Sequence, residues 1–273
     1  MRLYLTVRPE DVREAAPYHR ELAHAAYHIG EESALLRRNL LVQTSGGLLV
    51  LSDRGAPPVE DPEGLAGALL RECGRRSYSG IVLDFEMPPR RDLSDLAAAL
   101  GRSCAAGHRP LYLPEAYAKL TAHRIVIINT AVSGGSFEEH LREVISLYGG
   151  SQHIALDVQL LRMCFSLPAP TGLGEPLTPE KLDTLLHAQG PAVFFSRDLC
   201  ARYFTCTRSG QAQFILFDDA GTLRQKLRLG QQLGVAAAFF QWPEISNIKI
   251  EREQTKLDDK GRPVFDADGE PVK

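Results

Sequence analysis

The stretch Tyr78–Glu86, YSGIVLDFE, decides the fold of this chain. Its apolar centre ends at two acids and is followed by Met87-Pro88-Pro89, which stops any regular element. A short apolar run bounded in this way is typical of a buried strand in a parallel sheet. Because side chains alternate along a strand, Asp84 and Glu86 are expected to point the same way, about 7 Å apart. Two carboxylates crowded at the end of a buried strand indicate a functional site, because paired acids can divide acid and base work.

Similar apolar runs alternate with helix-periodic stretches along most of the chain, a pattern typical of a parallel sheet covered by helices. The predicted strands are Leu3–Val7, Ala25–Ile29, Leu48–Ser52, Gly80–Phe85, Pro110–Leu113, Arg124–Asn129, His153–Val158 and Val235–Gln241. The predicted helices are Pro9–Glu21, Asp61–Arg76, Leu93–Ala106, Glu115–Thr121, Phe137–Tyr148 and Thr222–Leu233. This order predicts an α/β fold, a (β/α)₈ TIM barrel. A doubly wound sheet is the alternative, but neither GxGxxG nor GxxxxGK occurs in the sequence.

The regular rhythm breaks between the seventh and eighth predicted strands. Residues 160–218 are predicted to form a small α+β insertion inside a barrel that covers residues 1–250. Its predicted parts are a Pro/Gly-rich loop at Pro168–Pro176, a helix at Thr178–His187 and strands at Val193–Phe195, Tyr203–Thr207 and Gln213–Phe217. Residues 251–273 are polar with two turn signals, and we interpret them as a hairpin or mobile tail.

The composition narrows the classes of partner. A net charge of −3 and a pI near 6.3 argue against nucleic acid. No run approaches membrane-spanning length, and the charged N-terminus has no signal-peptide core, so the sequence as it stands predicts a cytoplasmic protein without a membrane partner. The 5 scattered cysteines lack a CxxC pair and suggest reduced thiols. We expect no metal, since His24 and His28 lack a clustered third ligand, and no cofactor; the oligomeric state is left open.

In a barrel, inward side chains at the C-terminal strand ends form the active site. On the fourth strand, Val82 would lie deeper than Asp84 and Glu86, which would then line the mouth. The alternative, that the two acids merely pair with Arg90 or Arg91, is less favoured because inward acids at strand ends usually serve function. Asp157 and Gln159 on the seventh strand, Asp53 after the third and Glu115 after the fifth could also line the mouth, but for each of them singly ordinary surface or salt-bridge placement is favoured.

Three segments together resemble glycoside hydrolase family 18, the chitinase-like barrels. YSGIVLDFE resembles the family's fourth-strand signature DGxDxDxE, and more closely the spore-associated and peptidoglycan-acting branch that reads DGxNxDFE. Phe217–Lys226 is similar to the family's paired acids, capping residue and lysine-bearing helix, and Gly234–Trp242 is similar to its last strand. The resemblance covers roughly residues 1–248 and includes the small insertion.

The resemblance implies that Glu86 is the general acid and that Asp84 orients the substrate's acetamido group and supports Glu86. It implies hydrolysis of β-linked N-acetylglucosamine-containing glycans with retention, because in this family the substrate's own acetamide attacks the anomeric carbon. Trp242 would form the aromatic floor; the alternative for a lone tryptophan near a strand end is simple packing at the rim of the barrel. The remaining expected substrate-binding residues at the mouth are Tyr112, Asn129, Asp157 and Gln159.

The sequence also departs from the family pattern. The first two acid positions of the degenerate DxxDxDxE motif hold Ser79 and Val82, and Ile128–Ala131 lacks the tyrosine that clamps the acetamide. A catalytically silent barrel that binds a glycan or a protein is therefore the second hypothesis, and an enzyme that reuses the acids on another substrate is a third. The resemblance to spore proteins is also compatible with a place at the spore or cell envelope.

Overall fold

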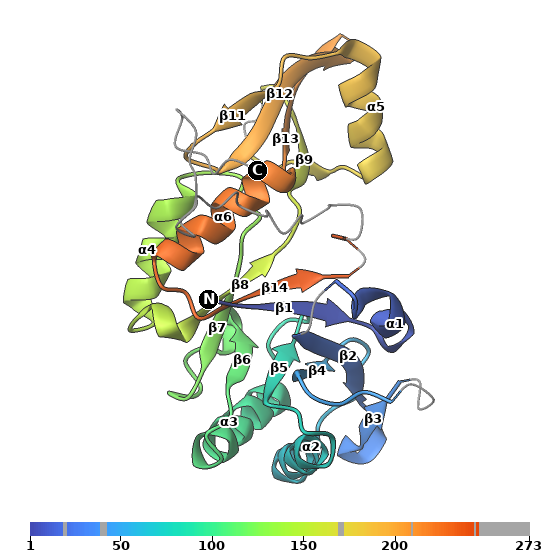
Figure 1. Cartoon of the computed structure of the whole chain (residues 1–273), viewed down its shortest axis with the longest axis vertical. Helices are drawn as coiled ribbons and strands as arrows, with labels where there is room; N and C mark the ends of the chain where they lie inside the picture. The colour runs from blue at the N-terminus through green and yellow to red at the C-terminus, as the bar shows by residue number, and fades with distance from the viewer. Residues whose placement is uncertain (19–20, 39–42, 169–171, 209, 243, 246–273) are drawn as a thin grey trace, which may run out of the picture.

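A computed structural model describes residues 1–18, 21–38, 43–168, 172–208, 210–242 and 244–245 of the 273-residue chain. The predicted tail at 251–273 lies outside the described residues. Figure 1 shows a barrel in the lower part of the view and a smaller layer, which contains α5, above it.

The barrel confirms the predicted fold. Its 8 parallel strands form one sheet that closes on itself, because the first strand pairs with both the second and the last. In chain order they are β1 (Arg2–Val7), β2 (Leu22–Ile29), β4 (Leu48–Ser52), β5 (Gly80–Asp84), β6 (Leu111–Pro114), β7 (Ile125–Asn129), β8 (Ile154–Val158) and β14 (Ala237–Gln241). Every predicted strand is present, with small shifts at the ends. A short strand, β3 (Leu35–Arg37), adds an antiparallel edge to β2 and was not predicted.

Four long helices cover the outside of the barrel. They are α2 (Pro62–Arg76), α3 (Arg91–Ala106), α4 (Phe137–Leu147) and α6 (Ala220–Gln232). Three of them begin at a side chain that accepts a backbone N–H of the first turn: Asp61 for α2, Ser136 for α4 and Asp219 for α6. Short 3₁₀ turns, η2 (Glu31–Ser33) and η4 (Ser151–His153), precede β3 and β8.

Two predicted helices are much shorter in the structure. The first is a 3₁₀ turn, η1 (Pro9–Asp11), followed by one turn of helix, α1 (Val12–Ala15). Proline lacks the backbone N–H that a helix interior needs, so Pro17 does not extend α1. The second, predicted at Glu115–Thr121, is only the 3₁₀ turn η3 (Glu115–Tyr117). An isolated run of that length gains too few hydrogen bonds to offset the cost of starting a helix.

Strand parity sorts the core into two layers. One layer fills the barrel interior and contains Tyr4, Val50, Val82, Tyr112 and Phe239. The other lies between the strands and the covering helices. The inner rings of Tyr4 and Phe239 stack with centroids 5.3 Å apart, so aromatic side chains close the barrel beneath its mouth.

The insertion lies between β8 and β14, as predicted. Its strands form a separate antiparallel sheet of 5 strands. The elements are β9 (Arg162–Ser166), β10 (Glu175–Pro176), α5 (Pro179–Gln189), β11 (Phe194–Ser196), β12 (Ala201–Arg208) and β13 (Gln211–Phe217). Leu182 of α5 packs with Phe204 and Ile215 on one face of this sheet. Strands β9 and β10 were not predicted.

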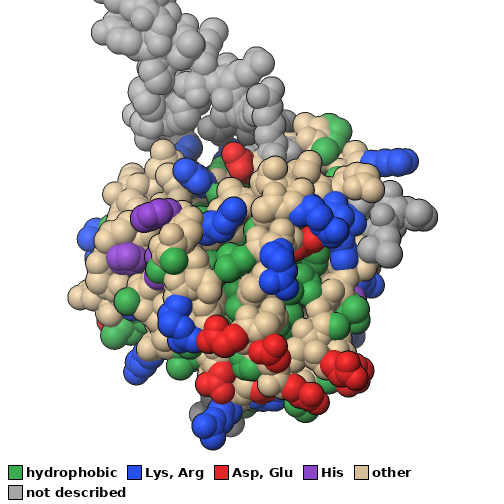
Figure 2. Space-filling view, turned by 90° about the horizontal axis from the view of Figure 1, so that it is seen from below, with side chains coloured by type: hydrophobic (Ala, Val, Ile, Leu, Met, Phe, Trp, Pro, Cys, Tyr) green, Lys and Arg blue, Asp and Glu red, His purple; other side chains and the backbone are tan. Residues whose placement is uncertain are grey.

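The surface shows charges of both signs. The face in Figure 2, seen from below the view of Figure 1, carries Lys and Arg side chains and a row of Asp and Glu side chains along one edge. Among the described residues, no helix combines the length and the apolar character needed to cross a membrane.

Candidate active site

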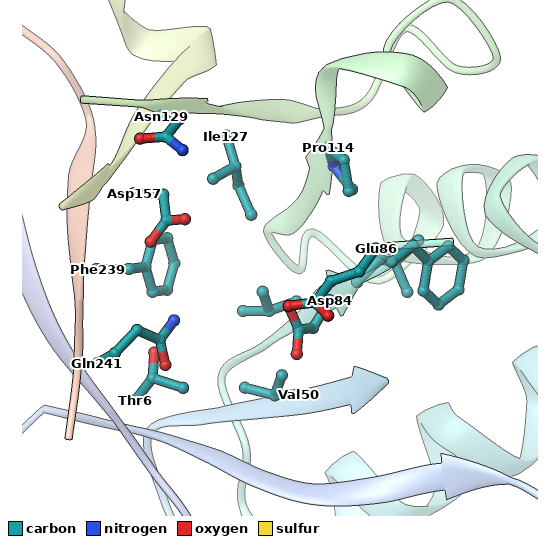
Figure 3. A pocket seen from close by; sticks show the side chains of 13 residues that line it. Thr6, Val50, Asp84, Glu86, Pro114, Ile127, Asn129, Asp157, Phe239 and Gln241 are labelled. Carbon is teal, nitrogen blue, oxygen red and sulfur yellow. The ribbon is translucent and has the colours of Figure 1, made fainter. Parts of the chain in front are cut away.

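A pocket opens at the C-terminal ends of the barrel strands, where the fold places catalytic groups. Its cavity of about 180 Å³ is smaller than the roughly 300–1,000 Å³ of most small-molecule pockets. The residues that line it are Thr6, Val50, Val82, Leu83, Asp84, Phe85, Glu86, Pro114, Ile127, Asn129, Asp157, Phe239 and Gln241. Figure 3 shows Asp84 and Glu86 on one side of the pocket and Asp157 and Gln241 on the other.

Asp84 and Glu86 both reach the pocket, but their surroundings differ. Asp84 is the last residue of β5 and is half-buried. Glu86 lies beyond the end of the strand, and its side chain is 62% exposed. Its Oε2 lies 3.4 Å from a guanidinium nitrogen of Arg54, which is itself 82% exposed. Glu86 is therefore a rim group, open to solvent, while Asp84 lies deeper.

Asp53 fixes the turn that carries Glu86. Its carboxylate accepts the backbone N–H of Glu86 at 3.0 Å and of Met87 at 3.1 Å. The residue is 1% exposed, so the favoured placement at the surface is wrong. The turn after β5 leaves these two N–H groups without strand partners, and a carboxylate at the end of the neighbouring strand β4 satisfies both. An acid placed directly after a buried strand was the signal in the sequence.

The pocket raises the pKa of Asp84. Burial raises this pKa to about 6, and the negative charges of Glu86, Asp157 and Asp53 add to the shift. A carboxyl group with such a pKa exchanges its proton near neutral pH, as acid–base catalysis requires.

Three polar side chains form the wall opposite Asp84. The Asn129 side chain donates to Oε1 of Gln159 at 2.9 Å, and the Gln159 amide donates to Oδ2 of Asp157 at 2.7 Å. The backbone N–H of Ala131 donates to Oδ1 of Asn129 at 2.7 Å and thereby sets the orientation of the first amide. The structure thus brings together three residues that were predicted to bind substrate, since Asn129 and Asp157 line the pocket and Gln159 joins them.

Asp157 is also shifted toward the neutral form. Burial raises its pKa to about 6, while the amide of Gln159 lowers it. Glu244 and Glu86 add to the rise, and Gln241 opposes it. Two carboxyl groups with similar pKa values therefore face one small cavity.

Trp242 and Tyr112, the two predicted aromatic contacts, do not line the pocket. In β14, Ala237 and Phe239 belong to the inner layer and Phe240 to the outer one. Trp242, directly after the strand, also belongs to the outer layer and points away from the cavity. Its ring, 5% exposed, packs against Tyr18 with centroids 5.2 Å apart. The neighbouring residue Gln241 lines the pocket instead and was not predicted.

Tyr112 does point inward, but it lies below the pocket. It is 3% exposed, and its ring packs edge-on against Phe239, with centroids 5.1 Å apart, within the inner layer. No tyrosine lines the pocket among the described residues. Within the same part of the chain, no group of three or more His, Cys, Asp or Glu side chains could hold a metal ion. The arrangement offers proton transfer from carboxyl groups and hydrogen bonds from amides.

Comparison with known proteins supports the fold alone. Neither a protein-family model nor a curated protein matches the chain. Among solved structures, the chain is similar to the Bacillus cereus spore cortex-lytic enzyme SleL, with a TM-score of 0.61 and 14% identity, over 88% of this chain and 70% of that one. The corresponding enzyme of Bacillus megaterium QM B1551 gives a TM-score of 0.60 at 12% identity, with the same coverage.

A plant enzyme has the same fold. The class V chitinase from Nicotiana tobaccum aligns with a TM-score of 0.59 and 12% identity, over 88% of this chain and 92% of that one. A variant of that chitinase was solved in complex with NAG4. The chain therefore has the fold of chitinases and spore cortex-lytic enzymes, at identities that leave its own activity to be argued from the site.

Proposed function

We propose that this protein is a glycosidase that hydrolyses N-acetylglucosamine-containing glycans at the mouth of its barrel. Glu86 donates the proton to the glycosidic oxygen, and Asp84 supports it. The observation that carries the proposal is the position of these two acids, which lie together at the end of β5 on one side of the cavity.

The surroundings of the two acids fit this division of work. Glu86 sits at the rim, where the scissile oxygen of a bound chain would lie, and Asp53 holds its backbone. Asp84 lies deeper, and its raised pKa of about 6 lets it hold a proton next to Glu86 near neutral pH. The shared fold with chitinases and spore cortex-lytic enzymes supports the substrate class.

The second candidate function is a silent barrel that binds a glycan without cleaving it. One observation favours it: Glu86, the expected acid, pairs with Arg54 at the surface. Among the residues that the structure describes, no tyrosine lines the pocket to hold an acetamide. The route that the resemblance implies, attack by the acetamide with retention, therefore lacks its usual clamp, and the stereochemistry of the product tests it.

The decisive variant is Glu86→Gln, assayed with chromogenic N-acetylglucosamine oligomers and with peptidoglycan fragments. Loss of a general acid is expected to lower the rate by about 10²- to 10⁴-fold, while calorimetry shows unchanged ligand affinity. Glu138→Gln is the matched control, because Glu138 is another exposed glutamate paired with an arginine, Arg142 on α4.

The outcomes separate the two candidates. Turnover by the parent protein and the control, but not by Glu86→Gln, supports the glycosidase. Ligand binding by all three proteins with no turnover supports the silent barrel and rejects the enzyme. Equal turnover by parent and Glu86→Gln shows that another group donates the proton.

A further inference from the structure

A second cavity, of about 300 Å³, lies where the insertion meets the barrel, and we call it the junction pocket. The side chains that define it are Phe195 of β11, Arg202 of β12, and Arg224 and Arg228 of α6. Figure 1 shows α6 below these two strands, and a hydrogen bond of 2.9 Å from Nε of Arg202 to Oδ2 of Asp219 joins the sheet to the start of the helix. The junction pocket shares no lining residue with the pocket at the mouth.

We propose that the junction pocket binds a phosphate group. Three arginine side chains line it, and none of its described lining residues is acidic. A guanidinium presents its N–H donors in a rigid fork that fits phosphate oxygens. A phosphate monoester carries close to two negative charges at pH 7 and three strong acceptor oxygens, whereas a carboxylate carries one charge and two oxygens. Three arginines from two elements therefore fit a phosphate better than a carboxylate. This inference goes beyond the proposed glycosidase and does not depend on it.

Arg202 is held in place by the protein itself. It lies directly opposite Phe195 in the β11–β12 ladder, and its guanidinium carbon lies 5.7 Å from the centroid of the Phe195 ring. A cation over an aromatic face is stabilised by the ring, and the bond to Asp219 fixes the guanidinium from another side. The side chain is still 38% exposed and so remains accessible. A group that is ordered in advance loses little conformational entropy when a ligand binds.

Arg224 and Arg228 lie one turn apart on the same face of α6. Nε of Arg224 donates to the carbonyl of Ala220 at 3.1 Å, which turns this side chain toward the first turn of the helix. Like charges four positions apart destabilise a helix, and an anion between them offsets that cost. Gly221, in the first turn, also lines the pocket and has no side chain to fill it. The partial positive charge at the start of α6 acts in the same direction as the arginines.

Calorimetric titration of the whole protein with inorganic phosphate tests the site. Saturable binding with a dissociation constant below about 10 mM is expected, and acetate, the carboxylate probe, is expected to bind at least about tenfold more weakly. Glucose 6-phosphate is the second phosphate probe. Tighter binding of this sugar phosphate than of inorganic phosphate assigns the site to a phosphate carried on a sugar, and an affinity no higher assigns it to free phosphate.

Substitutions in α6 test the role of the arginines. Arg228, which is exposed, is changed first: Arg228→Gln is expected to weaken phosphate binding by about 10- to 100-fold, because it removes hydrogen bonds between charged groups. Arg228→Lys keeps the charge but loses the fork, so its affinity is expected to lie between those of the parent and Arg228→Gln. Arg224→Gln repeats the test one turn away. Arg142→Gln is the matched control, because Arg142 is an exposed arginine on α4, outside the junction pocket.

The outcomes separate a built site from chance binding of ions. Weaker phosphate binding in at least one folded pocket variant, with parent-like binding in Arg142→Gln, supports the site; thermal midpoints establish that each variant is folded. Unchanged binding in both Arg228→Gln and Arg224→Gln, an equal loss in Arg142→Gln, or equally tight binding of acetate shows an adventitious ion only and overturns the inference. Absence of saturable phosphate binding by the parent protein also overturns it.

Glycan turnover keeps this inference apart from the proposed function. Turnover by Arg228→Gln is expected to equal that of the parent, because Arg228 lies outside the pocket at the mouth. Failure of phosphate binding therefore leaves the glycosidase standing, and a parent protein without turnover still binds phosphate if the junction pocket is a site.

Discussion

Two regions of the molecule bury carboxylates, and they do so in opposite ways. At the mouth, Asp84 and Asp157 face a cavity, and no Lys or Arg lines it among the described residues. Where the insertion joins the barrel, Asp218 and Lys226 form an ion pair at 2.8 Å, and both side chains are 0% exposed. The second oxygen of Asp218 accepts the hydroxyl of Thr222 at 2.8 Å.

The difference shows that a buried carboxylate can serve the fold or can mark a candidate functional site, depending on its partners. Both oxygens of the Asp218 carboxylate have hydrogen-bond or ion-pair partners, so the buried charge is compensated and joins the insertion to the barrel. Asp84 and Asp157 carry an energetic cost that other carboxylates increase, and each has a raised pKa of about 6 as a result. Acids whose pKa is raised in this way, and which face a cleft, are candidates for a functional site.

Lys226→Met tests the structural side of this comparison and should have the largest effect. The variant leaves the Asp218 carboxylate buried without its cation, so the free energy of unfolding is expected to fall by about 3–5 kcal/mol. Urea unfolding measures it. The double variant that adds Asp218→Asn removes both charges and is expected to recover much of the loss. A loss below about 1 kcal/mol in Lys226→Met would place this pair with surface ion pairs instead.

Asp84→Asn tests the functional side and should act in the opposite direction. The pKa of Asp84 rises from 3.8 unfolded to about 6 folded, so the folded state binds more protons between these values. Stability is therefore highest below about pH 4 and is lost as the pH rises through 6. The amide removes this penalty, so the variant is expected to be more stable than the parent by about 2–3 kcal/mol at pH 8 and equal to it near pH 4.

Urea unfolding at the two pH values measures this effect, and glycan turnover should fall in the same variant. Asp95→Asn, a change at an exposed site on α3, serves as the control and is expected to stay within about 0.5 kcal/mol at both pH values. A destabilised Asp84→Asn at pH 8 would show that this carboxylate supports the fold as Asp218 does.

The smallest effects should come from two neighbours at the end of β14. Gln241 lines the pocket and Trp242 packs outside it. Gln241→Ala is expected to weaken binding of an N-acetylglucosamine oligomer about fivefold, which corresponds to one hydrogen bond of about 1 kcal/mol. Trp242→Phe is expected to leave affinity within about twofold. Calorimetry measures both affinities. A larger loss of affinity in Trp242→Phe than in Gln241→Ala would show that Trp242 contacts the sugar.

The sequence predicted the barrel well because its strands and helices carry strong local signals. The eight apolar runs, the capping residues Asp61 and Ser136 and the position of Asp84 all depend on neighbours in the chain. Side chains at the C-terminal ends of barrel strands are expected to meet at the mouth. Asn129, Asp157 and Gln159 do lie together in one wall there, because a parallel barrel brings these strand ends to the same side.

The predictions failed where the local sequence pattern does not show which way a side chain points or which distant groups it contacts. The last strand runs within Gly234–Trp242, GVAAAFFQW, which is apolar on both faces and therefore shows no alternation to tell which residues point inward. Trp242 was assigned to the pocket from the family resemblance, and no alternation in this strand contradicted that assignment. The role of Asp53 depends on two backbone N–H groups of Glu86 and Met87, more than thirty positions further along the chain, and only the closed sheet brings them together.

The two ends of the insertion lie beside each other. The backbone N–H of Asp218 donates to the carbonyl of Leu161 at 2.8 Å, and the N–H of Leu161 donates to the Asp218 carboxylate at 3.0 Å. The inserted segment therefore begins and ends at adjacent positions that two hydrogen bonds hold together, as is common for inserted domains. Evolution can lengthen, shorten or replace that segment, and so reshape one side of the mouth, without altering the register of the eight strands that hold the acids.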